Sequence, residues 1–417
     1  MKADILIRGC NELHTLSGGK GPKVGEQMMD TGCIKKGAFV VKDGLILDVG
    51  EELYIQENYH AEECLDATGK TVVPGFVDPH THLVFSGSRE DELVMKIQGK
   101  TYMEILDTGG GILRTVRKTR EATKEQLMRE MKKRMDVMLA HGTTTAEAKS
   151  GYGLDLENEI KCLEAIKEME HPLELVPTYM GAHALPPEFQ DHSEYIDYCC
   201  NTVLPEISRR DLAQFCDVFC EKGVFDAKDS MELLIKAAEL GMGIKVHADE
   251  IKNIGCSTMA AELGAVSCEH LVKSSSQDIK AMTDNGIIGI LLPGTPFMLM
   301  DDEYPSARKM IDNRMPIALA TDLNPNCWTE SMQMVITLAC LQMKMLPQEA
   351  LTASTYNAAR AIRRYDIGSI EPGKKADFVV LDIPNLMHLP YRFGVNLVEN
   401  VFKGGKQIIT RETSKSA

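Results

Sequence analysis

From about residue 75 to residue 365, hydrophobic positions follow one repeated pattern: a short apolar run precedes a longer amphipathic stretch. Runs such as LELVPTYMG and GIKVHAD are bounded by Gly and Asp and predict buried strands. Stretches such as TKEQLMREMKKRMDVMLAHG and DSMELLIKAAELG predict helices. Strands that alternate with helices are typical of parallel sheets with right-handed crossovers.

The candidate strands of this segment decide between two α/β folds. They are GFVDPH, ILRTV, TTTAEAKSG, LELVPTYMG, FCDVFCE, GIKVHAD, AVSCEH, GIIGILLPG and PIALATD. About eight strand–helix units favour a (β/α)₈ barrel of the TIM type. A doubly wound Rossmann-type sheet is the alternative, but no GxGxxG follows the first strand.

Both ends of the chain have a different, β-like pattern. ADILIRGC and GAFVVKDGLILDVG lie near the start, and ADFVVLDI and VENVFKGGKQII lie near the end. Because the two ends of a barrel lie close together, these segments can meet in one small domain. We therefore expect residues 1–72 and 365–417 to form a β-sandwich domain, with the barrel over residues 73–364.

Composition argues against several classes of protein, namely nucleic-acid-binding, disulfide-rich secreted and membrane-spanning proteins. The formal net charge of −15 argues against nucleic-acid binding, which needs a basic surface. The 12 cysteines contain no CxxC pair, which favours reduced thiols in a cytoplasmic protein. The N-terminus does not resemble a signal peptide, and the apolar stretch GIIGILLPGTPFMLM is too interrupted to span a membrane.

Six polar side chains fall at the carboxyl ends of predicted strands, the face on which barrels build active sites. They are His80, His82, His183, His247, His270 and Asp322. The remaining histidines are interpreted as ordinary surface or core groups: His14, His60, His141, His171, His192 and His388.

The spacing of these residues predicts a metal site. His80 and His82 are two residues apart in an extended segment, so both side chains point to the same side. With His247 and Asp322 they offer three nitrogens and one oxygen, a set that suits zinc or iron. The metal would lower the pKa of a bound water toward neutrality. His270 is expected to hydrogen-bond that water rather than bind the metal.

Three further residues have two interpretations each. Glu250 lies three residues after His247 and is either a general base or a helix N-terminal charge. Arg89 either binds a substrate carboxylate or is a solvated loop residue. Tyr152, in KSGYGL, either faces the barrel mouth or belongs to a plain turn.

Some barrel hydrolases instead hold two metals with a carbamylated lysine. The fourth predicted strand ends in YMGAH and has no lysine. Lys149, after the third, is the remaining candidate, and a single metal is the simpler hypothesis.

The motifs PGFVDPHTH and GSIEPGKKADFVVLD resemble those of the amidohydrolase superfamily. FSGSRE, AKSGYG, PTYMGAHALPPEF, KVHADEI, SCEHL and TDLNPN are similar to the imidazolonepropionase family. That resemblance implies hydrolysis of the cyclic amide C–N bond of 4-imidazolone-5-propanoate to N-formimino-L-glutamate, a step of histidine degradation. It also implies one Zn²⁺ or Fe³⁺ ion, and we expect a homodimer, as in many such barrels.

The resemblance also implies individual roles. The implied ligands are His80, His82, His247 and Asp322. The implied substrate contacts are Arg89, Tyr152, His183, Glu250 and Asn324, with His270 beside the metal water. This chain reads NPNCW where many members read NPGS, so Asn326 and Cys327 are added as candidate substrate contacts.

These roles give a mechanistic hypothesis. Arg89 and Tyr152 bind the substrate carboxylate, and the metal, with help from His183, polarises the ring carbonyl. A metal-bound hydroxide attacks, and Glu250 or Asp322 relays the proton to the departing nitrogen. Two other functions remain open: a related deaminase of the guanine type, and a barrel that binds without catalysis.

Overall fold

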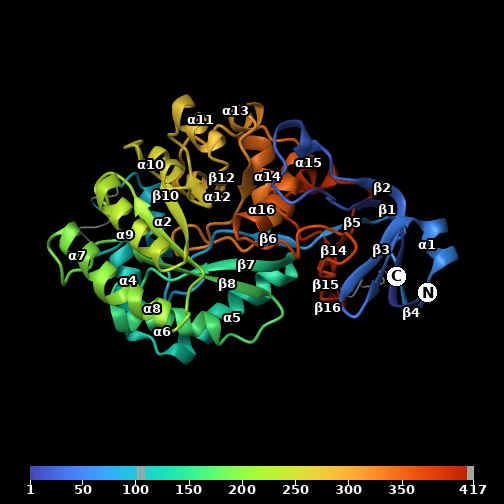
Figure 1. Cartoon of the computed structure of the whole chain (residues 1–417), viewed down its shortest axis with the longest axis horizontal. Coiled ribbons are helices and arrows are strands. Elements are labelled where there is room, and N and C mark those ends of the chain that lie inside the picture. The colour runs from blue at the N-terminus through green and yellow to red at the C-terminus, as the bar shows by residue number, and fades with distance from the viewer. Residues whose placement is uncertain (101–103, 105–108, 411–417) are drawn as a thin grey trace.

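A computed structural model of the chain describes residues 1–100, 104 and 109–410. It contains two eight-stranded sheets, a parallel barrel and a mixed sheet built from both ends of the chain (Figure 1). The fold class predicted from the sequence is confirmed. Residues 411–417 of the predicted last segment lie outside the described residues.

The barrel strands follow one another in chain order and pair in parallel. They are β6 (Phe76–Asp78), β7 (Thr143–Lys149), β8 (Glu174–Ala182), β9 (Phe215–Cys220), β10 (Gly243–Ala248), β11 (Ser267–His270), β12 (Ile288–Leu291) and β13 (Ile317–Leu319). All except β8 are buried along their whole length, as the helices on the outside and the side chains on the inside require.

The barrel closes just beyond its first and last strands. Thr81 and Leu323 form a parallel bridge there. The His82 amide donates to the Leu323 carbonyl at 2.9 Å, and the Asp322 amide donates to the His80 carbonyl at 3.2 Å. This seam therefore holds three of the four predicted metal ligands on adjacent backbone segments.

Helices surround the barrel and connect its strands (Figure 1). They are α2 (Glu90–Ile97), α4 (Ile112–Glu121), α5 (Lys124–Ala140), α6 (Leu156–Lys167), α7 (His192–Tyr198), the π-helical turn η2 (Cys199–Val203), α8 (Leu204–Arg209), α9 (Ala227–Glu239), α10 (Cys256–Glu262), α11 (Ser276–Asp284), α12 (Gly294–Leu299), α13 (Ala307–Asp312), α14 (Met332–Gln342), α15 (Pro347–Ala353) and α16 (Tyr356–Ala361).

One predicted strand is wrong. ILRTV begins the helix α4, which buries Thr115, Val116 and Thr119 on one face. This spacing of three to four residues is helical, and five residues were too few to reveal it. The other predicted strands are the ones that form the barrel.

The terminal sheet joins both ends of the chain in the order β16-β15-β14-β5-β1-β2-β3, with β4 also paired to β1. Phe39 and Phe402, from opposite ends of the sequence, both pack against Phe378. Their ring centroids lie 4.9 Å and 4.3 Å, respectively, from that of Phe378. Its strands are β1 (Lys2–His14), β2 (Cys33–Lys42), β3 (Leu45–Glu51), β4 (His60–Asp66), β5 (Thr71–Pro74), β14 (Phe378–Leu381), β15 (Val398–Lys403) and β16 (Lys406–Thr410), accompanied by η1 (Gly25–Met29), α1 (Glu52–Asn58) and α17 (His388–Tyr391).

The expectation that all cysteines are reduced is wrong for one pair. Cys220 ends β9 and Cys256 begins α10, and the two form a disulfide. Their Cα atoms lie 5.9 Å apart because the loop after β10 brings α10 back against the end of β9. The other ten cysteines are free.

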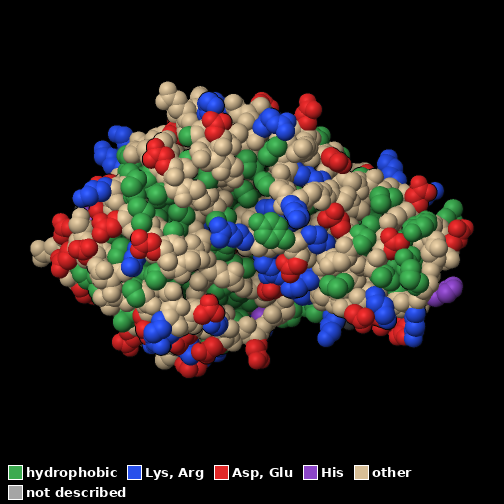
Figure 2. All heavy atoms as spheres, in the orientation of Figure 1, with side chains coloured by type: hydrophobic (Ala, Val, Ile, Leu, Met, Phe, Trp, Pro, Cys, Tyr) green, Lys and Arg blue, Asp and Glu red, His purple; other side chains and the backbone are tan. Residues whose placement is uncertain are grey.

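Acidic and basic side chains are interspersed over the face shown in Figure 2. Among the described residues, no helix has the length and apolar character needed to cross a membrane.

Candidate active site

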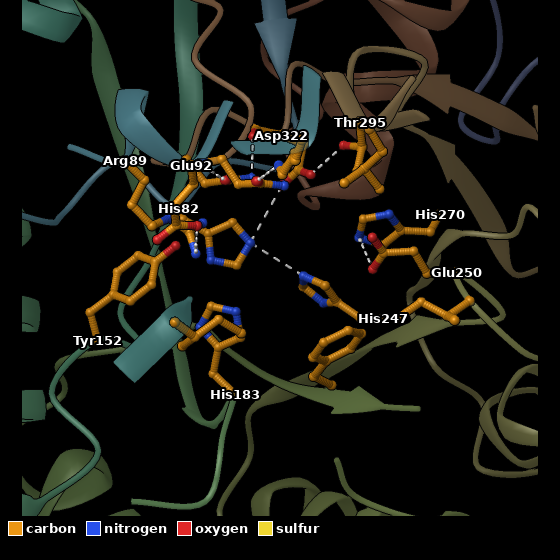
Figure 3. Close-up of a pocket in the computed structure, with 17 residues that line it drawn as sticks. His82, Arg89, Glu92, Tyr152, His183, His247, Glu250, His270, Thr295 and Asp322 are labelled. Atoms are coloured by element: carbon orange, nitrogen blue, oxygen red, sulfur yellow. Dashed lines mark hydrogen bonds and ion pairs between the residues drawn. The ribbon is translucent and has the colours of Figure 1, made fainter. Parts of the chain in front are cut away.

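The four predicted metal ligands meet at the carboxyl ends of the barrel strands. Figure 3 shows three of them, His82, His247 and Asp322. Nε2 of His80 lies 3.3 Å from Oδ1 of Asp322, and Nε2 of His82 lies 3.5 Å from the same oxygen. Nε2 of His247 lies 3.3 Å from Nε2 of His82. These side chains are almost completely buried, so their polar atoms face one another rather than solvent.

This cluster fits a metal ion. Nε2 of His80 and Oδ1 of Asp322 are buried without a hydrogen-bond partner, an arrangement that costs free energy unless a cation satisfies them. His80, His82 and Asp322 offer ligand atoms close enough to share one ion, as do His80, His247 and His270. Burial alone would raise the pKa of Asp322. The hydrogen bond and the positive charge of His80 outweigh burial and hold this pKa far below its ordinary value. Asp322 is therefore a carboxylate.

Carboxylates beneath the cluster orient two of the imidazoles. Nδ1 of His80 contacts Oε2 of Glu269, and Nδ1 of His247 lies 3.0 Å from Oδ2 of Asp217. A proton on each Nδ1 faces its carboxylate and leaves Nε2 free to bind an ion. Such partners behind a histidine ligand set its tautomer and ring orientation.

Two buried lysines neutralise these carboxylates inside the barrel. Nζ of Lys149 lies 2.6 Å from Asp217, 2.8 Å from Glu147 and 3.2 Å from Glu269. Nζ of Lys245 lies 2.7 Å from Glu147 and 2.9 Å from Glu269.

The surroundings of Lys149 decide its protonation state. Burial opposes its charge, but the three carboxylates outweigh burial and raise the pKa of Lys149 well above its ordinary value. Lys149 is therefore an ammonium. A carbamate there would place a negative charge against three carboxylates, so the geometry excludes the carbamylated-lysine alternative.

A cavity of about 170 Å³ lies above the cluster. Arg89 and Tyr152 lie on one side of it, and Glu250 and His270 lie on the other (Figure 3). Arg89 precedes α2 and is buried, with Nη1 3.9 Å from Glu92 and Nε without a hydrogen-bond partner. The predicted carboxylate anchor thus lies inside the cavity instead of in a solvated loop.

The turn that carries Tyr152 is held by a buried carboxylate. Oε1 of Glu159 accepts hydrogen bonds from the amides of Gly151, Gly153 and Leu154 at 2.8–3.1 Å. Gly151 has a φ of +100°, and a Cβ there would lie 2.8 Å from the Met180 carbonyl oxygen. Burial raises the pKa of Tyr152, so its phenol stays protonated and able to donate.

His183 is oriented by the same turn. Its Nδ1 lies 2.9 Å from the Gly151 carbonyl oxygen, which can only accept, so Nδ1 carries the proton. Burial, with repulsion from His247, lowers the pKa of His183 to about 3. The imidazole is therefore neutral, and its Nε2 is a hydrogen-bond acceptor.

The NPNCW loop carries three candidate substrate contacts, Asn324, Asn326 and Cys327, and only two of them line the cavity. Asn324 lines the cavity, but its Oδ1 accepts the amides of Asn326 and Cys327 at 2.7 and 3.0 Å. Asn326 also lines the cavity and contacts Nζ of Lys96. The Cys327 thiol is fully buried and points to the Thr321 carbonyl oxygen, 3.7 Å away. Asn326 is thus positioned to contact a ligand, whereas Cys327 lies beneath the loop.

Comparisons with known proteins agree with this geometry. The amidohydrolase family model matches residues 71–408. The imidazolonepropionase of Alkaliphilus metalliredigens is 48% identical over 419 residues, covering 99% of this chain and 99% of that protein. The imidazolonepropionase of Geobacillus kaustophilus is 48% identical over 415 residues, covering 97% and 98%. This chain belongs to the imidazolonepropionase family. Amidohydrolases are metal-dependent, and this chain has a buried donor cluster of the kind that can hold a metal ion.

The imidazolonepropionase family shares its fold with other hydrolases. A 5-methylcytosine deaminase from Klebsiella pneumoniae matches with a TM-score of 0.75 at 17% identity, covering 98% of both chains. An adenosine deaminase from Xanthomonas campestris matches with a TM-score of 0.74 at 16% identity, covering 98% of this chain and 93% of that one. At these identities the likeness concerns the fold alone.

The sequence analysis did not identify the charged side chains of Lys245 and Glu147, which lie beneath the proposed metal ligands, or Lys96, which lines the cavity. Lys245 lies two residues before His247, and Glu147 lies two residues before Lys149. Charged residues at a period of two within otherwise apolar strands were the available signal, because such positions face the barrel interior. Lys96, on α2, lines the cavity and gave no comparable signal.

Proposed function

We propose that the chain hydrolyses the cyclic amide C–N bond of 4-imidazolone-5-propanoate and releases N-formimino-L-glutamate. The observation that supports this substrate is a single cavity that joins a metal-type His/Asp cluster to a buried arginine. The cluster suits activation of water toward an amide, and the arginine suits a carboxylate. A guanine-type substrate carries no carboxylate for Arg89 to bind.

One Zn²⁺ or Fe³⁺ ion would be held by His80, His82, His247 and Asp322. When bound, such an ion activates a water molecule and polarises the ring carbonyl. Imidazole and carboxylate ligands suit both ions. Elemental analysis of protein purified from a medium that contains both metals distinguishes them.

Arg89 and Tyr152 orient the substrate. The Arg89 guanidinium pairs with the propanoate carboxylate, and the Tyr152 hydroxyl donates to it. Lys96, which also lines the cavity, adds positive charge. Neutral His183 accepts a hydrogen bond from a ring N–H through Nε2, which replaces our earlier expectation that it polarises the carbonyl.

Glu250 is the proton carrier that the geometry favours. Burial, followed by the charges of Asp322 and Glu221, raises the pKa of Glu250 to about 8. Its Oε2 lies 3.6 Å from Nε2 of His270, at the edge of the metal cluster. Oδ1 of Asp322 faces the two histidines and is the proposed ligand atom, and Oδ2 accepts from the Thr295 hydroxyl. Glu250 therefore takes the proton from water and delivers it to the departing ring nitrogen.

Removal of the metal tests the reaction directly. Protein dialysed against a chelator should lose turnover of imidazolonepropanoate, and Zn²⁺ or Fe²⁺/Fe³⁺ should restore it, because the cluster has no other source of activated water. Turnover is measured from the loss of substrate absorbance, with guanine as the comparison substrate. Deamination of guanine would support the alternative enzyme. No turnover of either substrate by metal-loaded protein would support a barrel without catalysis.

Arg89→Ala should lower kcat/KM for imidazolonepropanoate by about 10- to 150-fold, mostly through KM. A hydrogen bond to a charged group contributes roughly 1.5–3 kcal/mol, and the Arg89 guanidinium is the buried partner for the carboxylate. Arg129→Ala, on the exposed face of α5, is the matched control and should leave kcat/KM unchanged. An unchanged kcat/KM in Arg89→Ala would rule out Arg89 as the anchor.

A further inference from the structure

A second cluster of metal-binding side chains lies far from the barrel mouth, on two strands of the terminal sheet. Glu12 and His14 are two residues apart on β1, so their side chains leave the same face of the sheet. Cys33 begins β2 and is the cross-strand partner of His14 in the antiparallel pair. Figure 1 shows β1 and β2 side by side.

The ligand atoms of these three residues converge. Oε2 of Glu12 lies 3.1 Å from Nε2 of His14. One ligand atom from each of Glu12, His14 and Cys33 lies within 4.8 Å of the other two. The ligands of a tetrahedral zinc ion are about 3.3–3.8 Å apart, given bond lengths of roughly 2.0–2.3 Å. Shifts of up to about 1 Å at the exposed Cys33 side chain would bring its sulfur into this range.

The surroundings of His14 are those of a ligand. Its side chain is almost completely buried, and Nδ1 lies 2.8 Å from the Thr31 hydroxyl. Without an ion, Nε2 carries the proton, because the Glu12 carboxylate 3.1 Å away can only accept. When an ion binds Nε2, the proton moves to Nδ1, which then donates to the Thr31 hydroxyl, as in histidines that bind metals. The backbone amide of Leu386 donates to Oε2 of Glu12 at 2.9 Å and helps to fix the carboxylate.

We propose that Glu12, His14 and Cys33 bind a divalent transition-metal ion, with zinc as the best match, and that water completes the coordination. The ligand set is a carboxylate, a neutral imidazole and a thiolate, so its charge of −2 balances the ion. Binding releases the Cys33 thiol proton to solvent and forms the metal–sulfur bond. Because Glu12 also accepts the Leu386 amide, the ion braces the β1–β2 pair against the segment before α17.

Metal stoichiometry tests the second site on the intact enzyme. Protein whose catalytic site is loaded is equilibrated with Zn²⁺, freed of excess metal on a desalting column, and analysed for zinc. The wild-type chain should retain two ions, and Cys33→Ser should retain one. Cys64→Ser changes another exposed free cysteine of the same sheet, on β4, and should retain two.

Cobalt substitution identifies the sulfur ligand independently. Co²⁺-loaded wild type and Cys64→Ser should show a near-ultraviolet sulfur-to-cobalt charge-transfer band, and Cys33→Ser should lack it. Turnover of imidazolonepropanoate should be the same in all three proteins, because Cys33 does not line the active-site cavity. One zinc ion per wild-type chain, or a band that persists in Cys33→Ser, would overturn the proposal.

Discussion

Glu250→Gln should lower kcat by about 10²- to 10⁴-fold while the protein keeps its wild-type metal content, because glutamine cannot carry the proton. Glu250 lines the cavity, is partly buried, and approaches His270 without being one of the four proposed ligands. A loss of kcat without loss of metal therefore separates proton transfer from metal binding. Glu262→Gln, an exposed carboxylate on α10, is the matched control.

The pH profile adds a second readout for Glu250. Burial raises its pKa from 4.5 toward 8 in the metal-free site, whereas the charge of a bound ion acts in the opposite direction. A base must be ionised to act, so kcat should rise with pH along a limb between these two values. The limb should disappear in Glu250→Gln. A retained limb with near-normal kcat would assign the proton transfer to Asp322.

Lys149→Met should destabilise the protein by about 3–5 kcal/mol, because it removes one partner of a buried ion network. The change removes the lysine that pairs with Asp217 and leaves Lys245 as the lysine that pairs with Glu147 and Glu269 among the described residues of the barrel interior. We also expect metal affinity to fall by about 10- to 100-fold, because Asp217 and Glu269 orient two of the ligands.

Urea unfolding of the metal-free protein and a competitive chelator titration measure these two effects of Lys149→Met. Lys132→Met is the matched control, since it breaks an exposed ion pair with Asp136 one helical turn away. Such a pair contributes only about 0.3–0.5 kcal/mol. Equal unfolding free energies for the two variants would show that the network contributes no more than a surface ion pair.

The fold was predictable because its pattern is repeated. Apolar runs separated by amphipathic stretches define a barrel even when one run, ILRTV, is misassigned, because the remaining strands complete the count. That error arose because five residues are compatible with both the two-residue period of a strand and the 3.6-residue period of a helix. The disulfide between Cys220 and Cys256 could not be predicted, because their approach depends on how the loop after β10 returns to β9.

The arrangement of the candidate active site was predictable where side chains lie at strand ends, and it was unpredictable where contacts depend on packing. His80, His82, His247 and Asp322 could be grouped because the barrel brings strand ends together. The acceptor role of His183 depends on its distance to one carbonyl oxygen, which the sequence does not contain.

Lys96 and Cys327 also occupy positions that depend on packing and could not be predicted from the sequence. Lys96 enters the cavity only because α2 passes over it. Cys327 turns away from the cavity because Asn324 binds the backbone of the loop.

The seam that closes the barrel has a consequence for biosynthesis. His80 and His82 leave the ribosome long before Asp322 is made, and the two parts of the chain meet only when the last strand docks beside the first. A nascent chain can therefore assemble the full set of ligands only after almost the whole barrel has been translated and closed. An ion held by these four proposed ligands would therefore bind only late in synthesis, and a truncated chain without the last strand would lack the complete site.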